Sequence, residues 1–201
     1  MTTLLYPQFE PARFINEQFP SVSLELMNAA HAPALIHSVS INDIWRNPFT
    51  VIPKPDAVEH YIDVALRDVA RGYARAFVIR SAAQVVGCTR FFHLNLQHYR
   101  VQIGGTWLAS HARHTGVNRA AKWLMLREAF EVMQLQRVEF TVHPENTLSR
   151  TALASLGAKF EGVLRQYLHV QGQAHDAAMY SVVREDWLEI QQRVRTGNHR
   201  L

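Results

Sequence analysis

A strand–loop–helix segment at residues 100–126 limits the possible folds of this chain more than any other sequence feature. Residues 100–108 have the character of a β-strand, and Trp123 and Leu126 belong to the apolar stripe of a long helix. Between them lies a loop that contains a glycine: Arg113-His114-Thr115-Gly116-Val117-Asn118. Residues 138–142 alternate as a strand again. The segment therefore continues into a strand–helix–strand unit, which belongs in a layered fold of helices on a sheet.

Further strands and helices are predicted on both sides of this unit. Strand patterns occur at residues 22–26, 76–79, 85–94, 100–108, 138–142, 159–170 and 177–183. Helical spacing of apolar residues occurs at residues 33–40, 58–69, after Asn118, at 147–156 and around Trp187. Antiparallel strands that lead into strand–helix–strand units predict an α+β fold with a mixed sheet.

The composition indicates one ordinary globular domain. Of the 201 residues, 48% are hydrophobic and 19% are charged, and no repeat or linker divides them. We expect an N-terminal arm at residues 1–20, a domain at 21–195 and a short tail at 196–201. The net charge of +4 is too diffuse to predict nucleic-acid binding. Neither a secretory signal nor a membrane-spanning stretch is apparent, so a cytoplasmic location is expected.

Cysteine and histidine usage argues against a disulfide and a metal site. Cys88 is the single cysteine, and its apolar surroundings predict a buried structural thiol. His111 and His114 have metal-ligand spacing only within a helix, and no third ligand accompanies them. We therefore expect no metal.

The 113–118 loop is the best candidate for a binding site. The first turn of a helix presents unpaired backbone N–H groups and a partial positive charge, which together bind phosphate. Gly116 lets the backbone approach an anion closely, and Arg113 adds a charged donor. Asn118 is either the helix cap or a loop residue just before it. A plain connection with a solvated arginine is the alternative on these residues alone.

Several motifs resemble those of the GNAT superfamily of N-acetyltransferases. The pattern Arg113-x-x-Gly116-x-Asn118 is similar to the family's pyrophosphate-binding motif, Arg/Gln-x-x-Gly-x-Gly/Ala, and departs from it at the last position. With Lys122 after it, the loop resembles the branch that acetylates the N-termini of ribosomal proteins. Further segments follow in the order of that branch: Arg137-Val138-Glu139-Phe140, Asn146-x-x-Ser149, Ala152-Leu153, Leu156-Gly157-Ala158, Glu161-Gly162-Val163-Leu164-Arg165 and Asp176.

The resemblance implies a mixed, mostly antiparallel sheet of seven strands, splayed open to admit acetyl-CoA. Backbone groups of Trp107 and Leu108 would hold the pantetheine arm, and Asn146 and Ser149 would reach towards the thioester. The pyrophosphate would lie against the loop residues Arg113, His114, Thr115, Gly116, Val117 and Asn118. Plainer roles stay open for Asn146 as a helix cap and for Ser149 as a surface residue of the first helical turn.

The catalytic positions depart from the wider family. Leu153 stands where many relatives have a tyrosine acid, so Ser149 is the implied proton donor, as in the ribosomal-protein branch. Leu168 and Gln102 stand where an acidic base is common. The residues that remain as candidate bases, directly or through a water, are His93, His143 and Tyr167, although residues of these types in strands more often have a structural role.

The acceptor is expected to be an amine of low pKa. At pH 7 a lysine amine with a pKa of ~10.4 costs roughly 4.6 kcal/mol to deprotonate, whereas an α-amine near ~7.8 costs about 1 kcal/mol. A site without a strong base therefore favours the α-amine of a protein or peptide, with a small amine as the second candidate. The resemblance also implies an acceptor site beside the early helices, because these cover the amine side of the sheet in the family. The residues that would line it, with packing of the core as the plainer alternative, are Trp45, Phe49, Tyr61 and His93.

Two matters stay open at this point. A non-catalytic module that binds acyl-CoA on the same fold is the alternative function, because the usual tyrosine and glutamate are absent. The chain could act alone or as a homodimer, and we expect neither nucleic acid nor a membrane among its partners.

Overall fold

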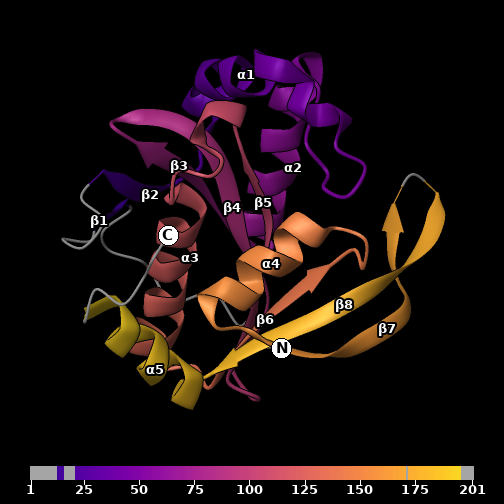
Figure 1. Cartoon of the computed structure of the whole chain (residues 1–201). Coiled ribbons are helices and arrows are strands. Elements are labelled where there is room, and N and C mark those ends of the chain that lie inside the picture. The colour runs from indigo at the N-terminus through magenta and orange to yellow at the C-terminus, as the bar shows by residue number, and fades with distance from the viewer. Residues whose placement is uncertain (1–12, 16–20, 171, 196–201) are drawn as a thin grey trace.

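The computed structural model describes residues 13–15, 21–170 and 172–195 of the chain. They form one mixed sheet of eight strands with helices packed on it (Figure 1). The order across the sheet is β1 (Arg13–Ile15), β2 (Val22–Leu26), β3 (Ala74–Ser81), β4 (Gln84–Asn95), β5 (Arg100–Leu108), β6 (Arg137–Val142), β8 (Gln173–Val183) and β7 (Lys159–Val170). Neighbouring strands are antiparallel except for β5 and β6, which are parallel.

The mixed, mostly antiparallel sheet expected from the sequence is confirmed. Strands β2 to β8 correspond to the seven expected strands, and β1 adds a short edge strand from within the expected N-terminal arm. The rest of that arm and the expected tail lie outside the described residues. The domain limits therefore stay predictions.

Helices flank both faces of this sheet. In the described part of the chain the α-helices are α1 (Ala32–Ser40), α2 (Val58–Ala70), α3 (Val117–Arg127), α4 (Thr147–Leu156) and α5 (Arg184–Arg195). Short 3-10 helices cover Ala29–His31, Ile41–Arg46, Pro55–Ala57 and Ser110–Ala112, and a π-helix at Glu128–Val132 continues α3. Each helix that the apolar spacing predicts is present. None that the structure describes is long and apolar enough to cross a membrane.

Two hydrophobic clusters lie on opposite faces of the sheet. One packs α3, α4 and α5 on the sheet and includes Phe77 and Trp187, whereas the other packs α1 and α2 and includes Val78 and Ile62. Phe77 and Val78 are neighbours in β3, so their side chains point to opposite faces. Because both faces are covered, the strand carries the continuous apolar run at residues 76–79 instead of an alternating pattern.

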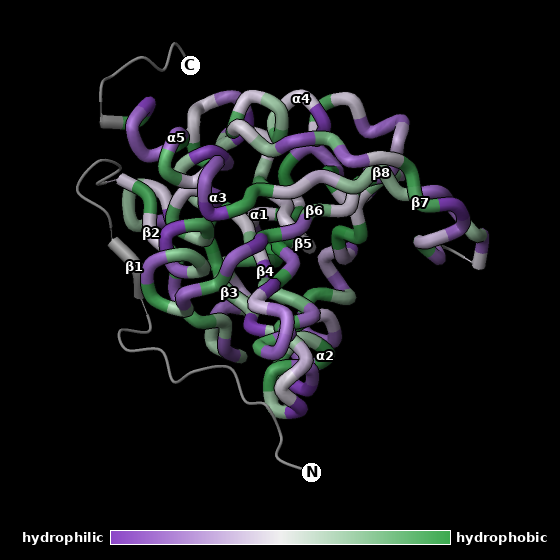
Figure 2. Tube along the Cα trace, turned by 90° about the horizontal axis from the view of Figure 1, so that it is seen from below, coloured by the Kyte–Doolittle hydropathy of each residue, from purple (hydrophilic) through white to green (hydrophobic). Residues whose placement is uncertain are grey.

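The β7–β8 hairpin extends beyond this two-sided core. Figures 1 and 2 both show its far end projecting past the helices, and Figure 2 shows that this end is largely hydrophilic. The ladder is irregular between Leu164 and Leu168, where the N–H of Gln166 donates to Asp176 Oδ1 at 2.8 Å. An irregularity of this kind locally bends the strand that carries it.

One expectation for the 113–118 loop is wrong. Helix α3 begins at Val117 with Gly116 as its N-cap, so Asn118 lies inside the first turn and does not cap the helix. Gly116 has φ of 85° and ψ of −12°. Glycine takes up this left-handed conformation without steric cost, and the turn therefore ends two residues earlier than an asparagine cap would place it.

The expectation for Cys88 is confirmed. Its side chain is fully buried, and its Sγ lies 3.2 Å from the Tyr61 hydroxyl. Burial raises the pKa of the thiol to about 11, so it remains protonated near neutral pH and is a poor nucleophile.

Candidate active site

Strands β5 and β6 separate soon after they meet. They pair at only three positions, from Arg100 opposite Arg137 to Gln102 opposite Glu139. Beyond Gln102, residues 103–108 of β5 have no strand on that side within the described part of the chain. The gap lies where the resemblance to the GNAT superfamily implies a splayed sheet.

A bulge in β5 accompanies this separation. Gly105 and Thr106 lie opposite a single residue of β4, Thr89, whose hydroxyl is 2.8 Å from the Thr106 hydroxyl. Gly105 has φ of +57°, and a Cβ at this position would lie 3.4 Å from the Phe92 ring. Because a bulge bends its strand and glycine tolerates this backbone, the bulge helps to turn β5 away from β6.

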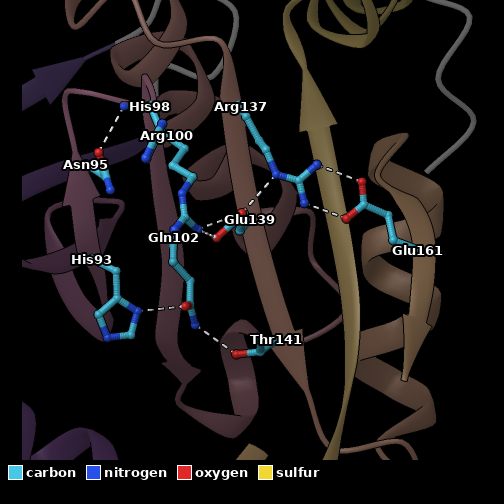
Figure 3. Close-up of polar contacts among 9 residues, drawn as sticks. All are labelled: His93, Asn95, His98, Arg100, Gln102, Arg137, Glu139, Thr141 and Glu161. Atoms are coloured by element: carbon cyan, nitrogen blue, oxygen red, sulfur yellow. Dashed lines mark hydrogen bonds and ion pairs between the residues drawn. The ribbon is translucent and has the colours of Figure 1, made fainter. Parts of the chain in front are cut away.

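Four charged residues join the strands at the closed end of the gap (Figure 3). Arg137 donates to Glu161 on β7 at 2.5 and 2.7 Å and to Glu139 at 2.9 Å, and Arg100 donates to Glu139 at 2.9 and 3.1 Å. The Arg137 guanidinium lowers the pKa of Glu161 to about 2, and Glu161 in turn raises the pKa of Arg137. We call these four residues the charged network. It links β5, β6 and β7 where β5 and β6 still pair.

Gln102 crosses the point at which the two strands part. Its Nε2 donates to the Thr141 hydroxyl at 2.8 Å, and its Oε1 accepts from His93 Nδ1 at 3.0 Å (Figure 3). With the amide in this orientation, His93 carries its proton on Nδ1 and keeps Nε2 as an acceptor. His93 is exposed and does not line the space inside the gap.

A cavity of about 430 Å³ occupies the gap. Residues from β4, β5, β6, β7, α2, α3, α4 and the chain before α2 line it: Phe49, Thr50, Val51, Tyr61, Val64, Arg90, Phe92, Gln102, Ile103, Gly104, Gly105, Thr106, Lys122, Phe140, Thr141, Val142, His143, Asn146, Ser149, Leu153 and Leu168. Four residues predicted as site residues are thus brought together: Phe49, Tyr61, Asn146 and Ser149.

Asn146 and Ser149 stand at the start of α4. Asn146 is the N-cap, and its Oδ1 accepts a hydrogen bond from the Ser149 N–H at 3.1 Å. The plain capping role is therefore present, and it holds the first turn against the cavity. The Ser149 hydroxyl has no hydrogen-bond partner among the residues that the structure describes, which leaves it available to a ligand.

Trp45 and Tyr167 lie outside the cavity lining. The Trp45 ring stacks with Arg46 and Lys54, whose charged groups lie 4.9 and 5.4 Å from its centroid. Tyr167 is 48% exposed, while the next residue, Leu168, lines the cavity. Their roles as substrate and catalytic residues, like that of His93, therefore stay predictions without support from this arrangement.

His143 is the candidate base that lines the cavity. Its ring centroid lies 5.0 Å from that of Phe49, and its Nε2 is 3.3 Å from Nδ1 of His175 on β8. The N–H of Glu145 donates to His143 Nδ1 at 3.3 Å. With Nδ1 accepting, a neutral His143 carries its proton on Nε2 and points it at His175.

The 113–118 loop has the features that an anionic group requires. Arg113 Nε donates to the Leu108 carbonyl at 3.1 Å, which ties the start of the loop to the end of β5, and the Thr115 hydroxyl donates to the Ala112 carbonyl of the preceding 3-10 helix at 2.8 Å. No side chain caps α3, whose first-turn N–H groups remain free for a ligand. His114 and Thr115 are exposed beside them.

The open edge of β5 suits the amides of a pantetheine arm. Trp107 and Leu108 pair with Cys88 and Gly87 of β4 on one side, and their other side faces the gap. Backbone groups without a strand partner need another hydrogen-bond partner, which an extended amide chain provides. The loop and this edge are continuous, so the residues present fit a CoA group that runs from the loop into the cavity.

The sequence analysis did not predict that two cations, Arg90 and Lys122, line the cavity, and it named Lys122 only as part of a family motif. Arg90 is 6% exposed, and its guanidinium carbon lies 4.4 Å from the centroid of the Tyr61 ring. Lys122 is 8% exposed, and burial lowers the pKa of its amine to about 8. A charged residue within an apolar strand, and another on the apolar side of a helix, were the signals that could have identified them.

Comparison with known proteins identifies the family. The model of the acetyltransferase (GNAT) domain matches residues 22–159. The chain therefore belongs to the GNAT acetyltransferase family, and it is an N-acetyltransferase. The enzymatic interpretation is thereby favoured over a non-catalytic module.

Relatives and solved structures agree with this assignment. The chain is 27% identical to YdaF of Bacillus subtilis, which carries a provisional assignment as a ribosomal N-acetyltransferase, over 66% of this chain and 74% of YdaF. It is 26% identical to Mycobacterium smegmatis RimJ, solved in complex with CoA-disulfide, with a TM-score of 0.75 over 88% and 89% of the two chains. A GCN5-related N-acetyltransferase from Brucella melitensis shares the fold, with 24% identity and a TM-score of 0.83 over 94% and 86%.

Proposed function

We propose that this protein transfers the acetyl group of acetyl-CoA directly to the α-amine of a protein or peptide. The observation that carries this proposal is the open edge of β5, which leads from the 113–118 loop into the cavity. The GNAT family uses acetyl-CoA, and its RimJ relative was solved with a CoA derivative. We expect the reaction to take place in the cytoplasm.

Binding would divide the cofactor between two regions. The free N–H groups at the start of α3 and the side chain of Arg113 would hold the pyrophosphate. The edge of β5 up to Leu108 would hold the pantetheine amides, which directs the thioester into the cavity beside α4. An N–H of this edge is also suited to stabilise the oxyanion that forms during attack.

Transfer would proceed in one ternary complex. The neutral amine attacks the acetyl carbonyl, the new C–N bond forms, and the C–S bond breaks to release the thiolate. The thiolate takes a proton from the Ser149 hydroxyl, which has no partner among the described residues and regains a proton from water. The proton lost by the amine also leaves through water, because His143 Nδ1 already accepts from Glu145 and its Nε2 faces His175. Much of the rate would come from holding the two reactants in place.

The α-amine is favoured because the cavity lacks a carboxylate base. Among the described residues that line it there is no Asp or Glu, and His143 is its only imidazole. An α-amine needs about 1 kcal/mol to become neutral at pH 7, whereas a lysine needs roughly 4.6 kcal/mol. YdaF, with its provisional ribosomal assignment, agrees with a protein N-terminus as acceptor.

The test measures acetyl transfer from acetyl-CoA to three sets of acceptors, and the release of free CoA is the measured signal. The acceptors are peptides with a free N-terminus, N-terminally blocked peptides that contain lysine, and small polyamines. We expect the free N-terminal peptides to have the highest kcat/KM. Faster acetylation of blocked lysine peptides or polyamines would refute the α-amine assignment.

Substitution of Gly116 tests the cofactor site within the same assay. In Gly116→Trp the side chain should fill the space for the pyrophosphate, so CoA affinity and turnover should both be lost. Gly116→Ala imposes the same backbone strain without the bulk, and it should keep more of both. Equal CoA affinity by calorimetry in folded wild type and Gly116→Trp would contradict the proposed loop.

A further inference from the structure

Arg90 is a buried cation without a polar partner. It lies in the middle of β4, is 6% exposed, and lines the cavity. Its Nε and Nη2 atoms are buried, and neither has a hydrogen-bond partner among the described residues. It also makes no ion pair with any of them. A guanidinium in this state is unusual, because buried charges in proteins are normally paired.

The Tyr61 ring compensates only part of the free-energy cost of burying the Arg90 charge. The guanidinium carbon lies 4.4 Å from the ring centroid, a contact of the cation–π type. Such a contact uses the flat face of the guanidinium and leaves the N–H groups at its edge without acceptors. The planar guanidinium of arginine can donate two parallel hydrogen bonds to a carboxylate. A carboxylate that enters the cavity would therefore accept the hydrogen bonds that no described residue accepts from Arg90.

The cavity as a whole is suited to an anionic group. Besides Arg90, its lining includes the amine of Lys122, which lies 6.0 Å from the Phe140 ring centroid. The described residues that line it include no carboxylate to balance these two cations. A surrounding of low dielectric constant strengthens the electrostatic attraction between these two cations and an anion. The cavity therefore favours a ligand that carries negative charge.

The site around Arg90 is separate from the site that we propose for the cofactor's phosphates. No residue of the 113–118 loop lines the cavity, whereas Arg90 pairs in the sheet with Gly104 of β5. Neighbouring strands lie about 4.8 Å apart, so Arg90 stands one strand from the edge along which the thioester would lie. Tyr61 of α2 covers Arg90, on the side where the acceptor is expected to enter.

We propose that Arg90 binds a carboxylate of the acceptor, which is therefore an amine with a carboxylate close to its nitrogen. This inference rests on the proposed acetyl transfer and narrows its substrate class. The carboxylate has two sources: the side chain of an acidic residue next to a free peptide N-terminus, or the α-carboxylate of a free amino acid. Arg90 is a specificity-determining residue in either case.

The experiment compares matched acceptors with and without the carboxylate. One pair is a peptide that begins Ser-Asp and its Ser-Asn counterpart, and the other is free serine and serine amide. We expect wild type to prefer the carboxylate member of at least one pair by about tenfold or more in kcat/KM, and the pair that responds identifies the source. A ratio near one in both pairs would overturn the inference.

Substitutions of Arg90 then assign this preference to the residue. Arg90→Met should lower the ratio within the responsive pair about tenfold, and Arg90→Lys should lower it less because the charge remains. Arg90→Met should fold, since replacing an unpaired buried charge by an apolar side chain is often neutral or stabilising. Lys54→Met, which removes a cation from the Trp45 ring outside the cavity, is the matched control and should leave the ratio unchanged.

Calorimetry separates failure of this inference from failure of the proposed function. Binding of the same acceptors to CoA-loaded protein is measured in wild type and in Arg90→Met. Carboxylate-dependent binding without acetyl transfer would contradict the proposed function and support the role of Arg90. Equal losses for both members of a pair in Arg90→Met and Arg90→Lys would overturn that role, because they would indicate action on the thioester or on the fold.

Discussion

At the scale of single residues, the cavity places a free hydroxyl in the same lining as a buried amine. The Ser149 hydroxyl has no partner in the described structure, and Lys122 contributes positive charge to the lining. Positive charge favours the anionic form of a group in its surroundings. A thiolate released into this cavity is therefore stabilised before it is protonated, and Ser149 is the uncharged group that can donate the proton.

Removal of the Ser149 hydroxyl should slow the chemical step. We expect Ser149→Ala to lower kcat about tenfold or more while the KM for acetyl-CoA changes little, since the hydroxyl acts on charge that develops during the reaction. Ser149→Thr keeps a hydroxyl and should keep more activity. The measurement is single-turnover acetylation with saturating acetyl-CoA. An unchanged rate in Ser149→Ala would rule out this role.

Single residues also mark the limits of prediction from sequence. Gly116 and Ser149 could be predicted because their spacing resembles family motifs, and both lie as expected at the starts of helices. Arg90 could not, because its meaning depends on the absence of a partner, and a sequence does not show which charges meet. Asn118 was wrong as a cap because a left-handed glycine ended the loop first.

At the scale of elements, the parallel pair of β5 and β6 depends on a short contact. Three paired positions hold the two strands, and the charged network lies over the same three positions. Strand identity could be predicted from periodicity, since all seven expected strands are present. The bulge at Gly105 could not, because a bulge depends on how two strands align and not on the pattern of either one.

The charged network should contribute acid-sensitive stability. Arg137 lowers the pKa of Glu161 from 4.5 to about 2, so between these values the unfolded state binds more protons than the folded state. The contribution is complete above about pH 5 and is lost as the pH falls towards 2. Since Glu161 is partly exposed, we expect Glu161→Gln to cost only about 0.5–1 kcal/mol at pH 7.

Urea unfolding of wild type and Glu161→Gln at pH 7, 5 and 3 measures this contribution. The difference between the two proteins should shrink at pH 3, where Glu161 is largely protonated in the unfolded chain while it stays mostly charged in the folded protein. Glu189→Gln removes a carboxylate that forms an exposed ion pair of 3.7 Å with Arg193 on the surface, and it should show a smaller difference. A difference that is constant over this range would contradict the linkage.

At the scale of the whole molecule, two cores hold the sheet while its centre stays open. Helices α1 and α2 cover one face and α3, α4 and α5 cover the other, so the strands are fixed on either side of the gap. The layered α+β architecture follows from the order of strand and helix patterns along the chain. The cavity does not, because it forms from residues between positions 49 and 168 that only the folded chain brings together.

The cofactor placement that we propose along the open edge of β5 would complete the sheet. A pantetheine arm along residues 103–108 would act as a missing strand, and its binding energy would add to the stability of the folded state by mass action. Backbone amides on this edge should exchange with deuterium faster in the free protein than in the CoA complex, and Gly116→Trp should show no such protection. Equal exchange with and without CoA in wild type would contradict this. In the proposed function, the cofactor would thus supply hydrogen-bonding backbone beside residues 103–108, where no strand of the described residues pairs with β5.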